Sequence, residues 1–163
     1  MTYTAAVVVA SNRAAAGVYE DTTGPLLVAA LREWGFDTPE PVVVPDGAPV
    51  GHAVSDAIRS EVAVVLTTGG TGINPTDRTP DEIAPLLDRT LPGVSEAIRA
   101  HGIAQGVPTA ALSRGVAGVA GRTLVVTLPG SSGGVRDGIA VLAHLVPHAV
   151  DQLAGGDHPG PAL

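Results

Sequence analysis

The sequence predicts an α/β sandwich with a mostly parallel β-sheet, and three observations lead to this prediction. Short apolar runs rich in valine have the length and composition of strands that are buried on both faces. Segments with apolar residues at helical spacing separate most of these runs, as expected for a parallel sheet covered by helices. The chain of 163 residues, 45% of them hydrophobic, is long enough for one domain with a substantial core.

The first half of the chain alternates strands with helices. Residues 4–10, "TAAVVVA", form the first predicted strand, and a polar loop follows it. A helix is expected to begin at Pro25, because proline fits the first turn of a helix, and to end at Gly35. Residues 42–44, "VVV", form the second strand. Pro49 then opens a second helix, whose apolar residues recur at helical spacing.

A third buried strand is predicted at residues 62–67, and the helix that follows it has a strong start signal. Thr79, Pro80 and Glu82 fit a capping box, with threonine at the N-cap, proline at the first helical position and glutamate at the third. We therefore expect the Thr79 hydroxyl to accept a hydrogen bond from the first turn of this helix.

The second half of the chain adds two short helical segments, predicted at residues 93–100 and 109–113. Two more strands are predicted at residues 115–119 and 122–128, in "GVAGV" and "RTLVVTL". A last helix follows "PGSSGG", and Pro147 is expected either to kink this helix or to start a new one.

We expect residues 1–154 to form a single domain and residues 155–163, "GGDHPGPAL", to form a flexible tail. The N-terminus has no basic segment, and its apolar stretch is too short for a signal peptide or a membrane span. The sequence therefore predicts a cytoplasmic protein that does not bind membranes.

The composition excludes several classes of site. All nine basic residues are arginine, so a Walker-type phosphate loop, a Schiff base and a lysine general base are excluded. The chain has no cysteine, which excludes disulfides, thiolate metal sites and cysteine nucleophiles. A net charge of −7 argues against nucleic-acid binding, which depends on basic patches. It does not exclude a small anionic ligand, because salt screens the distant charges.

Ligands of parallel α/β sheets bind beyond the carboxyl ends of the strands. Four loops follow predicted strands in this way, at residues 11–21, 45–47, 68–78 and 129–134. We expect these four loops to converge on one edge of the sheet. The candidate ligand-binding residues therefore come from segments that lie far apart in the sequence.

The third of these loops belongs to the segment "TTGGTGINPTDRTPDEI", residues 67–83. The backbone amides of a glycine-rich turn can close on a phosphate without interference from side chains, and the hydroxyls of Thr67, Thr68 and Thr71 add further donors. The candidate phosphate-binding residues in this segment are Thr68, Gly69, Gly70, Thr71 and Gly72.

Two aspartates follow neighbouring strands, and each has two interpretations. Asp77 either caps the helix behind it or binds a metal ion, since Mg²⁺ is usually held by one or two carboxylates together with substrate phosphates. Asp46, in "VVVPDG", belongs either to an ordinary Pro-Asp-Gly turn or to the same metal site. Two aspartates on neighbouring loops favour the metal site more than either does alone.

The arginines fall into two groups. Three of them occupy polar positions of predicted helices, where we expect solvated surface charges: Arg32, Arg59 and Arg99. Four others lie in or beside the predicted loops, where one or two could bind a phosphate through two parallel hydrogen bonds: Arg13, Arg78, Arg114 and Arg136.

Residues 130–134 fit the pattern G-x-S-x-G of a nucleophile elbow, with Ser132 at its centre. An α/β-hydrolase carries its acid and its histidine on later strand ends. Only one helical region and a tail follow this motif here. The sequence therefore argues against a serine hydrolase.

Taken together, "TTGGTGINPTDRTPDEI", "VVVPDG", "PTAALSR" and "LPGSSGG" resemble the MogA/MoaB family of molybdenum-cofactor biosynthesis proteins, which includes the G domain of gephyrin. The resemblance covers nearly the whole chain. It implies a three-layer α/β fold and an enzyme that uses ATP and Mg²⁺ to adenylylate molybdopterin, with release of pyrophosphate. It also implies a homotrimer or a hexamer, and a MoeA-type molybdenum insertase as a partner.

The resemblance also assigns roles to residues by their place in the motifs. Asp46 and Asp77 match the functional aspartates of the family and are the expected catalytic and Mg²⁺-binding residues. Asn12 stands where members of the family often have aspartate, so an anionic role at that position is lost. The expected residues for substrate and nucleotide binding are Ser11, Thr68, Gly69, Gly70, Thr71, Gly72, Ser113, Pro129, Gly130, Ser131 and Ser132. The alternative function is a catalytically silent, trimeric molybdopterin-binding protein.

Overall fold

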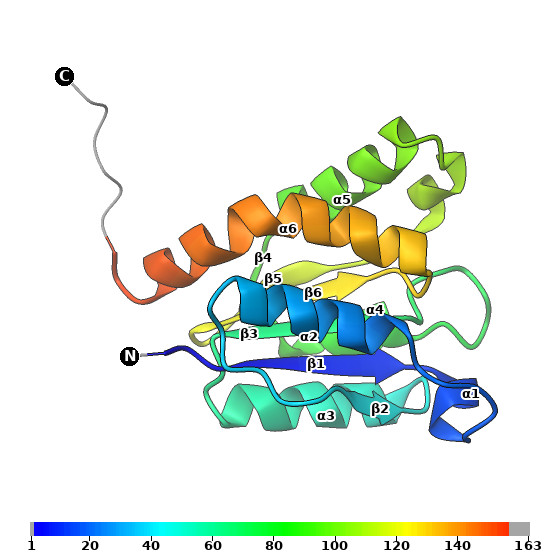
Figure 1. Ribbon diagram of the computed structural model, residues 1–163, viewed down its shortest axis with the longest axis horizontal. Coiled ribbons are helices and arrows are strands. Elements are labelled where there is room, and N and C mark those ends of the chain that lie inside the picture. Colours follow the sequence, from blue (N-terminus) through cyan, green and yellow to red (C-terminus); the bar gives the residue numbers. More distant parts are fainter. Residues whose placement is uncertain (1, 157–163) are drawn as a thin grey trace.

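A computed structural model describes residues 2–156 of the chain, and Figure 1 shows its six-stranded sheet with helices on both faces. The strands are β1 (Ala5–Ala10), β2 (Val42–Val44), β3 (Val64–Thr68), β4 (Arg89–Thr90), β5 (Ala117–Ala120) and β6 (Thr123–Leu128). The helices are α1 (Asn12–Ala15), α2 (Thr23–Glu33), α3 (Ala48–Arg59), α4 (Thr79–Ile83), α5 (Pro92–Ala104) and α6 (Ser132–Leu153). Two 3₁₀ segments are η1 (Ala84–Leu86) and η2 (Pro108–Leu112).

The strand order is β2-β1-β3-β6-β5-β4, and three of the five pairings are parallel. In the parallel part, Thr68 of β3 pairs with Val9 of β1 on one side and with Leu128 of β6 on the other. Strands β5 and β4 run antiparallel to their neighbours. The ends of β1, β2, β3 and β6 and the start of β5 therefore lie at one edge of the sheet. This arrangement confirms the predicted convergence of the four loops.

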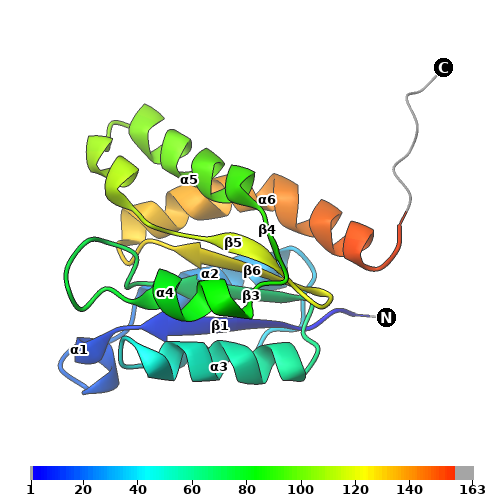
Figure 2. The same ribbon diagram turned by 180° about the vertical axis from the view of Figure 1, so that it is seen from behind.

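Two apolar layers cover the sheet. On one face, side chains of α2, α5 and α6 pack on the sheet, with Leu27, Leu31 and Leu142 fully buried. On the other face, α3 and α4 contribute a second cluster, which includes Val50 and Val54. Figure 2 shows this second face, with α3 and α4 in front of the sheet. The predicted three-layer sandwich with a mostly parallel sheet is confirmed.

Most differences from the predicted elements concern their ends and the shortest elements. Helix α1 and the two-residue strand β4 are not predicted, because neither contains a repeat of apolar residues long enough to indicate an element. Helix α6 continues through Pro147, so no new helix begins there. The predicted tail begins at Gly155, and its residues 157–163 lie outside the described residues. Within residues 2–156, no helix combines the length and the apolar character that crossing a membrane requires.

The predicted capping box is wrong. The N-cap of α4 is Arg78, which makes no side-chain capping bond, and Thr79 is the first helical residue. The Thr79 backbone N–H donates to the Gly70 carbonyl at 3.1 Å, and the side chain is fully buried. Packing against the glycine-rich loop therefore overrides the local signal for a cap. Glu82 lies 4.0 Å from the Arg78 guanidinium, with which it forms an ion pair.

Gly118→Ala should destabilise the protein by about 1–3 kcal/mol, the usual range for an overpacked buried site. A Cβ at Gly118 of β5 would overlap the Arg89 carbonyl oxygen of the neighbouring strand β4 and stand 2.8 Å from Leu87 Cδ1. Gly93→Ala in α5 is the matched control, because a Cβ there meets nothing within 4 Å. It should raise the stability by up to about 1 kcal/mol. Urea unfolding of both variants measures the difference, and equal effects would contradict the packing described for β4 and β5.

Candidate active site

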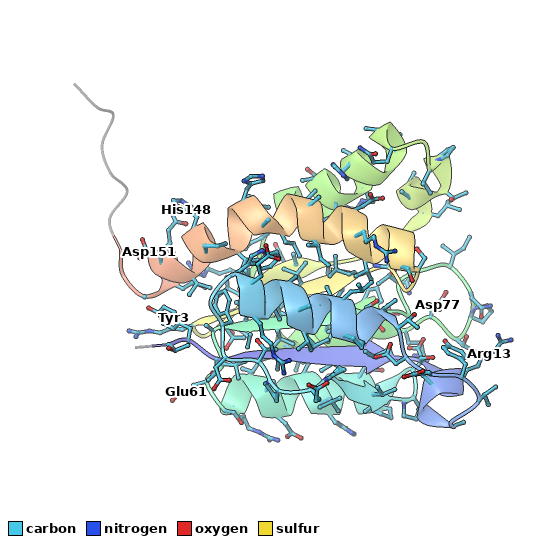
Figure 3. The ribbon with its side chains drawn as sticks, in the orientation of Figure 1. Tyr3, Arg13, Glu61, Asp77, His148 and Asp151 are labelled. Atoms are coloured by element: carbon cyan, nitrogen blue, oxygen red, sulfur yellow. The ribbon has the colours of Figure 1, made fainter. Side chains whose placement is uncertain are left out.

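The candidate site lies at the edge of the sheet where β1, β2, β3 and β6 end. Figure 3 labels Arg13 and Asp77 at this end of the molecule, with Tyr3 and Glu61 at the opposite end. The site is built from the loops that follow the parallel strands, together with the segment that precedes β5. It therefore collects residues from the whole length of the described chain.

The glycine-rich loop is a close-packed turn. Gly69 and Gly70 have φ angles of 93° and 67°, in the left-handed region that favours glycine. A Cβ at Gly69 would overlap the Ala10 carbonyl oxygen, and a Cβ at Gly130 would stand 3.2 Å from Gly69 Cα. The Gly69 N–H also donates to the Leu128 carbonyl at 3.1 Å. Three loops thus meet backbone against backbone at Gly69.

Three threonines at the start of this loop and at the end of β3 are buried. Thr67 and Thr68 are fully buried, and Thr71 is only 4% exposed. The Thr68 hydroxyl donates to the Pro129 carbonyl at 2.7 Å and so joins the β3 loop to the β6 loop. Because this hydroxyl proton is donated to the Pro129 carbonyl, Thr68 contributes to the site by holding two of its loops together.

Asp46 connects three of the converging loops. Its Oδ1 atom accepts hydrogen bonds from the Gly47 N–H at 2.8 Å and from the Arg78 N–H at 3.3 Å. Its own N–H donates to Asn12 Oδ1 at 3.0 Å, so Asn12 holds the turn through its amide. Within residues 2–156, Asp46 Oδ2 accepts no hydrogen bond, and it stands 2.7 Å from the point that a Gly70 Cβ would occupy. One oxygen of Asp46 is therefore fixed, and the other remains available over Gly70.

Asp77 lies on the other side of the same loop. The helix behind it has no side-chain capping bond, so the capping interpretation of Asp77 does not apply. Its Oδ2 accepts a hydrogen bond from the Asn74 N–H at 3.1 Å and would stand 2.7 Å from a Cβ at Gly72. The two predicted catalytic carboxylates thus flank the glycine-rich loop, with Asp46 against Gly70 and Asp77 against Gly72.

Arg114 holds the outer part of the loop. Its N–H donates to the Thr71 carbonyl at 2.7 Å, and its guanidinium donates to the carbonyls of Gly72 at 3.1 Å and Asp77 at 2.8 Å. The same guanidinium forms an ion pair with Asp81 at 3.1 Å. The hydrogen bond from Arg114 lowers the pKa of the Asp81 carboxyl below its ordinary value of 3.8. Arg114 therefore fixes the loop, and most of its donors are not available to a phosphate.

Three cavities adjoin this loop: one of about 490 Å³ is lined by Asp77, Arg78, Asp81 and Arg114, and the other two share Gly130 in their walls. The larger of these two, of about 370 Å³, lies against the start of α6, and the smaller, of about 220 Å³, lies against the loop after β1. Of the predicted binding residues, the larger cavity is lined by Thr71, Gly72, Ser113, Pro129, Gly130 and Ser131. The smaller is lined by Ser11, Thr68, Gly69, Gly70 and Gly130. Ser132 is the first residue of α6, directly after Ser131.

Three of the four serine hydroxyls of the predicted set are already bonded to neighbouring groups. Ser131 Oγ caps α6 by accepting the Gly134 N–H at 3.0 Å. Ser11 Oγ caps α1 by accepting the Ala14 N–H at 3.2 Å, and it lies 2.9 Å from the Tyr19 hydroxyl. Ser113 Oγ accepts the Gly115 N–H at 3.3 Å. The start of the 22-residue helix α6 faces the larger cavity, and its partial positive charge favours an anion there.

Arg99 is a residue of the site that the sequence analysis placed wrongly. It was predicted to be a solvated surface charge, but its guanidinium donates to the Ser113 and Gly115 carbonyls, each at 3.2 Å, and lines the larger cavity. Arg32 keeps its predicted place at the surface, with its side chain 51% exposed, and it also donates to the Thr38 carbonyl at 2.7 Å. Arg59 keeps its predicted exposure and pairs with an exposed aspartate of the same helix. No sequence motif identifies Arg99 as a residue of the site. The one indication in the sequence is Gly102, three residues later, because a glycine in a helix indicates close approach of another segment.

Asp21 is a second site residue without a prediction of its own. Its Oδ1 accepts the N–H groups of Thr23 and Gly24 at 3.1 and 3.2 Å, so it fixes the start of α2. Its Oδ2 is buried without a hydrogen-bond partner among residues 2–156, and the residue lines the smaller cavity. The sequence signal is "DTTGP", where an aspartate stands two residues before the first helical residue, Thr23.

Asp46 and Asp77 are the residues of the site that could hold a Mg²⁺ ion. The described part of the chain holds no cluster of three or more His, Cys, Asp or Glu side chains that could bind a metal by themselves. Mg²⁺ commonly takes one or two carboxylates and completes its shell with water and substrate phosphates. Asp46, whose Oδ2 accepts no hydrogen bond within residues 2–156, stands against Gly70, and Asp77 stands against Gly72, so either carboxylate could contribute to such a shell.

Comparisons with known proteins all identify molybdopterin proteins as similar to this chain. Residues 6–148 match a family described as a probable molybdopterin binding domain. A molybdopterin adenylyltransferase of Pyrococcus furiosus is 35% identical, over 91% of this chain and 92% of the relative. The structure of the molybdopterin biosynthesis Mog protein from Mycobacterium ulcerans superposes with a TM-score of 0.90, at 50% identity over 95% of this chain and 99% of that one.

A longer relative also matches. A molybdenum cofactor biosynthesis bifunctional protein of Synechococcus elongatus is 39% identical over 94% of this chain. The chain spans 48% of that relative, about half of its length. The fold described here therefore also occurs within longer proteins.

Arg114→Gln should raise the pKa of Asp81 toward 3.8, because the hydrogen bond that lowers it is lost. A depressed carboxyl pKa stabilises the folded state above the unfolded pKa, and this contribution disappears as the pH falls through the folded value. The wild type should therefore lose the stabilisation that comes from Asp81 at acid pH. The variant lacks this stabilisation and should show no such loss. Carbon-13 NMR titration of Asp81 measures both values. Arg122→Gln, in the turn between β5 and β6, is the control and should leave the Asp81 titration unchanged.

Proposed function

Because the chain belongs to the MogA/MoaB family of molybdenum-cofactor biosynthesis proteins, with its probable molybdopterin binding domain, we propose that it adenylylates molybdopterin. In this reaction a terminal phosphate oxygen of molybdopterin attacks the α-phosphorus of ATP. The bond from the α-phosphorus to the bridging oxygen breaks, and pyrophosphate leaves. The relative from Pyrococcus furiosus that matches over nearly its whole length is named for this activity.

The observation that carries the proposal is the pair of cavities on either side of Gly130. A reaction between two phosphorylated substrates needs two adjoining binding volumes, and these cavities share one wall residue next to the glycine-rich loop. The two aspartates flank this loop, with Asp46 against Gly70 and Asp77 against Gly72. Each carboxylate thus stands beside a glycine that lines one of the cavities.

The residues of the chain position the substrates and balance their charge, which is the main task in chemistry of this kind. Apart from the Gly69 N–H, which donates to the Leu128 carbonyl, backbone N–H groups of the glycine-rich loop and of the start of α6 would bind phosphate oxygens. Asp46 and Asp77 would hold Mg²⁺, which when bound neutralises negative charge on the phosphates of ATP. The arginines Arg99 and Arg114 act indirectly, because they hold the loops that line the site.

The proposed substrate contacts follow the walls of the two cavities. In the larger cavity they are Thr71, Gly72, Ser113, Pro129, Gly130 and Ser131, with Ser132 beside them; in the smaller they are Ser11, Thr68, Gly69 and Gly70. Arg13 makes no ion pair or side-chain hydrogen bond within residues 2–156, and it lies at the same end of the molecule as Asp77. Its guanidinium is thus available to a phosphate.

We also propose that the protein forms a homotrimer or a hexamer and works with a MoeA-type molybdenum insertase. Three exposed apolar side chains support association: Ile103, Val107 and Leu112 are 45–52% exposed around the end of α5 and in η2. The bifunctional relative supports the partner, because about half of its length lies beyond the part that resembles this chain. The cytoplasmic location stays a prediction of the sequence.

Asp77→Asn and Asp46→Asn should each reduce adenylyl transfer by about a hundredfold or more, since losing one positioned electrostatic group adds roughly 3–4 kcal/mol to a barrier. Asparagine keeps the size of the side chain, and its amide oxygen can accept the hydrogen bonds that Asp46 Oδ1 and Asp77 Oδ2 now accept. Molybdopterin binding should survive or tighten, because a carboxylate no longer repels its phosphate. Single-turnover formation of adenylylated molybdopterin and equilibrium binding are measured side by side.

Asp151→Asn is the control for these two variants, because Asp151 lies on α6 at the opposite end of the molecule (Figure 3) and should not affect turnover. Full activity in both site variants would exclude Asp46 and Asp77 as the catalytic pair. Molybdopterin binding without turnover in the wild type would instead identify a silent binding protein.

Light scattering at micromolar concentration should report the mass of a trimer or of a hexamer. Burial of the apolar side chains around α5 and η2 gives the free energy for association. Val107→Asp should lower the mass if this surface forms the contact, whereas Tyr3→Asp, at the far end of the sheet, serves as the control. A monomer in the wild type would contradict the proposed assembly.

A further inference from the structure

Thr79 carries a buried hydroxyl that nothing in the fold explains. The residue is 0% exposed, and its Oγ1 atom has no hydrogen-bond partner within residues 2–156. Buried side-chain hydroxyls are nearly always paired, so an exception in a folded protein requires a reason. The predicted reason, a helix cap, is absent, because α4 has no side-chain capping bond.

The hydroxyl is placed over Gly70, where it faces the carboxylate of Asp46. A Cβ at Gly70 would overlap Thr79 Oγ1, and the same point lies 2.7 Å from Asp46 Oδ2 and 2.9 Å from Oδ1. The missing side chain of Gly70 therefore leaves the space in which these two groups meet. The Thr79 backbone is held there by its hydrogen bond to the Gly70 carbonyl at 3.1 Å.

The two groups are complementary in their unused hydrogen-bonding capacity. Asp46 Oδ1 already accepts the N–H groups of Gly47 and Arg78, whereas Oδ2 accepts no hydrogen bond within the described residues. Thr79 has one O–H donor that lacks an acceptor. A donor without an acceptor thus stands beside an acceptor without a donor. Both atoms lie next to the point that a Gly70 Cβ would occupy, so the two groups are close neighbours.

We propose that Thr79 is a positioning residue for Asp46, whose Oδ2 atom accepts the Thr79 hydroxyl when nucleotide and divalent cation bind. This inference rests on the proposed role of Asp46 in holding Mg²⁺. A carboxylate oxygen has two lone pairs, so Oδ2 can accept this hydrogen bond and still bind a cation. The bond fixes the orientation of a carboxylate that the ligand-free protein holds by one oxygen only.

A purely structural role for Thr79 would require a different property of its side chain. Packing alone requires a side chain of this volume, and valine meets that requirement without the hydroxyl. The two roles can therefore be separated by two variants. Thr79→Val keeps the volume and removes the donor, whereas Thr79→Ser keeps the donor and removes a buried methyl group.

The test measures stability and ligand binding in the same variants. Without ligand, Thr79→Val should unfold at the same temperature as the wild type or higher, because an unpaired buried hydroxyl is removed. Thr79→Ser should unfold at a lower temperature, because it leaves a small cavity. The affinity for Mg·ATP should rank the two variants in the opposite order. Calorimetry should show this affinity reduced by about tenfold or more in Thr79→Val, and by far less in Thr79→Ser.

Two controls sharpen this test. Ser95→Ala removes another buried hydroxyl that has no partner among the described residues, on α5 and outside the walls of both cavities, and should leave Mg·ATP binding unchanged. A double-mutant cycle tests whether Thr79 acts through Asp46. In the Asp46→Asn background, Thr79→Val should cause little further loss of affinity, since the group that it positions is already altered.

The outcomes separate this inference from the proposed reaction. Wild-type affinity in Thr79→Val overturns the inference, as does a parallel loss of stability and affinity in both Thr79 variants. Adenylyl transfer in the wild type and in Thr79→Val at equal rates leaves the proposed function standing and also overturns the inference. Mg·ATP binding that depends on the hydroxyl, without adenylyl transfer, supports the inference and overturns the function. A wild type that binds no Mg·ATP overturns both.

Discussion

The whole site depends on one contact, the approach of the Gly69 backbone to the Ala10 carbonyl. This approach is possible because Thr68 of β3 is in parallel register with Val9 of β1 and Leu128 of β6. A Cβ at Gly69 would overlap that carbonyl oxygen, so only glycine permits the contact. From this point the chain must turn with positive φ at two successive glycines. That turn places the loop between the β2 side, which carries Asp46, and the β6 side, which carries Gly130.

A loop packed so closely needs few charged side chains to hold an anion. In the proposed function, backbone N–H groups and the start of α6 would provide the favourable potential that a chain of net charge −7 needs to bind phosphate at this edge. The arginines contribute through their geometry more than through their charge. Arg114 donates to the carbonyls of Gly72 and Asp77, and Arg99 holds the segment around Ser113. The planar guanidinium, with five donors, suits this use better than an ammonium group, which is consistent with a chain that has no lysine.

The fold and the location of the site could be predicted from the sequence, because both follow from short-range patterns. The valine runs and the helical stripes determine a parallel sheet, and a parallel sheet gathers its strand-end loops at one edge. Asp46 and the glycine-rich loop could be placed by this rule alone. Arg99 could not, because its acceptors lie 14 and 16 residues further along the chain and depend on how the segment before β5 returns to the sheet. The two cavities could not be predicted from the sequence either, because their shapes depend on packing between segments that lie far apart in the chain.

The failure at Thr79 has a different cause from the failure at Arg99. The segment "TPDE" carries a complete local signal for a capped helix, and capping would satisfy the threonine hydroxyl close to water. The chain instead starts α4 one residue earlier, leaves the N-cap at Arg78 without a side-chain bond and buries the hydroxyl unpaired. Both departures are unfavourable to folding, and they occur at one residue, next to the free oxygen of Asp46. Proteins tend to violate local rules at functional sites, where selection maintains an arrangement that stability alone would not favour. The absence of the expected capping bond is therefore itself a reason to assign Thr79 to the active site.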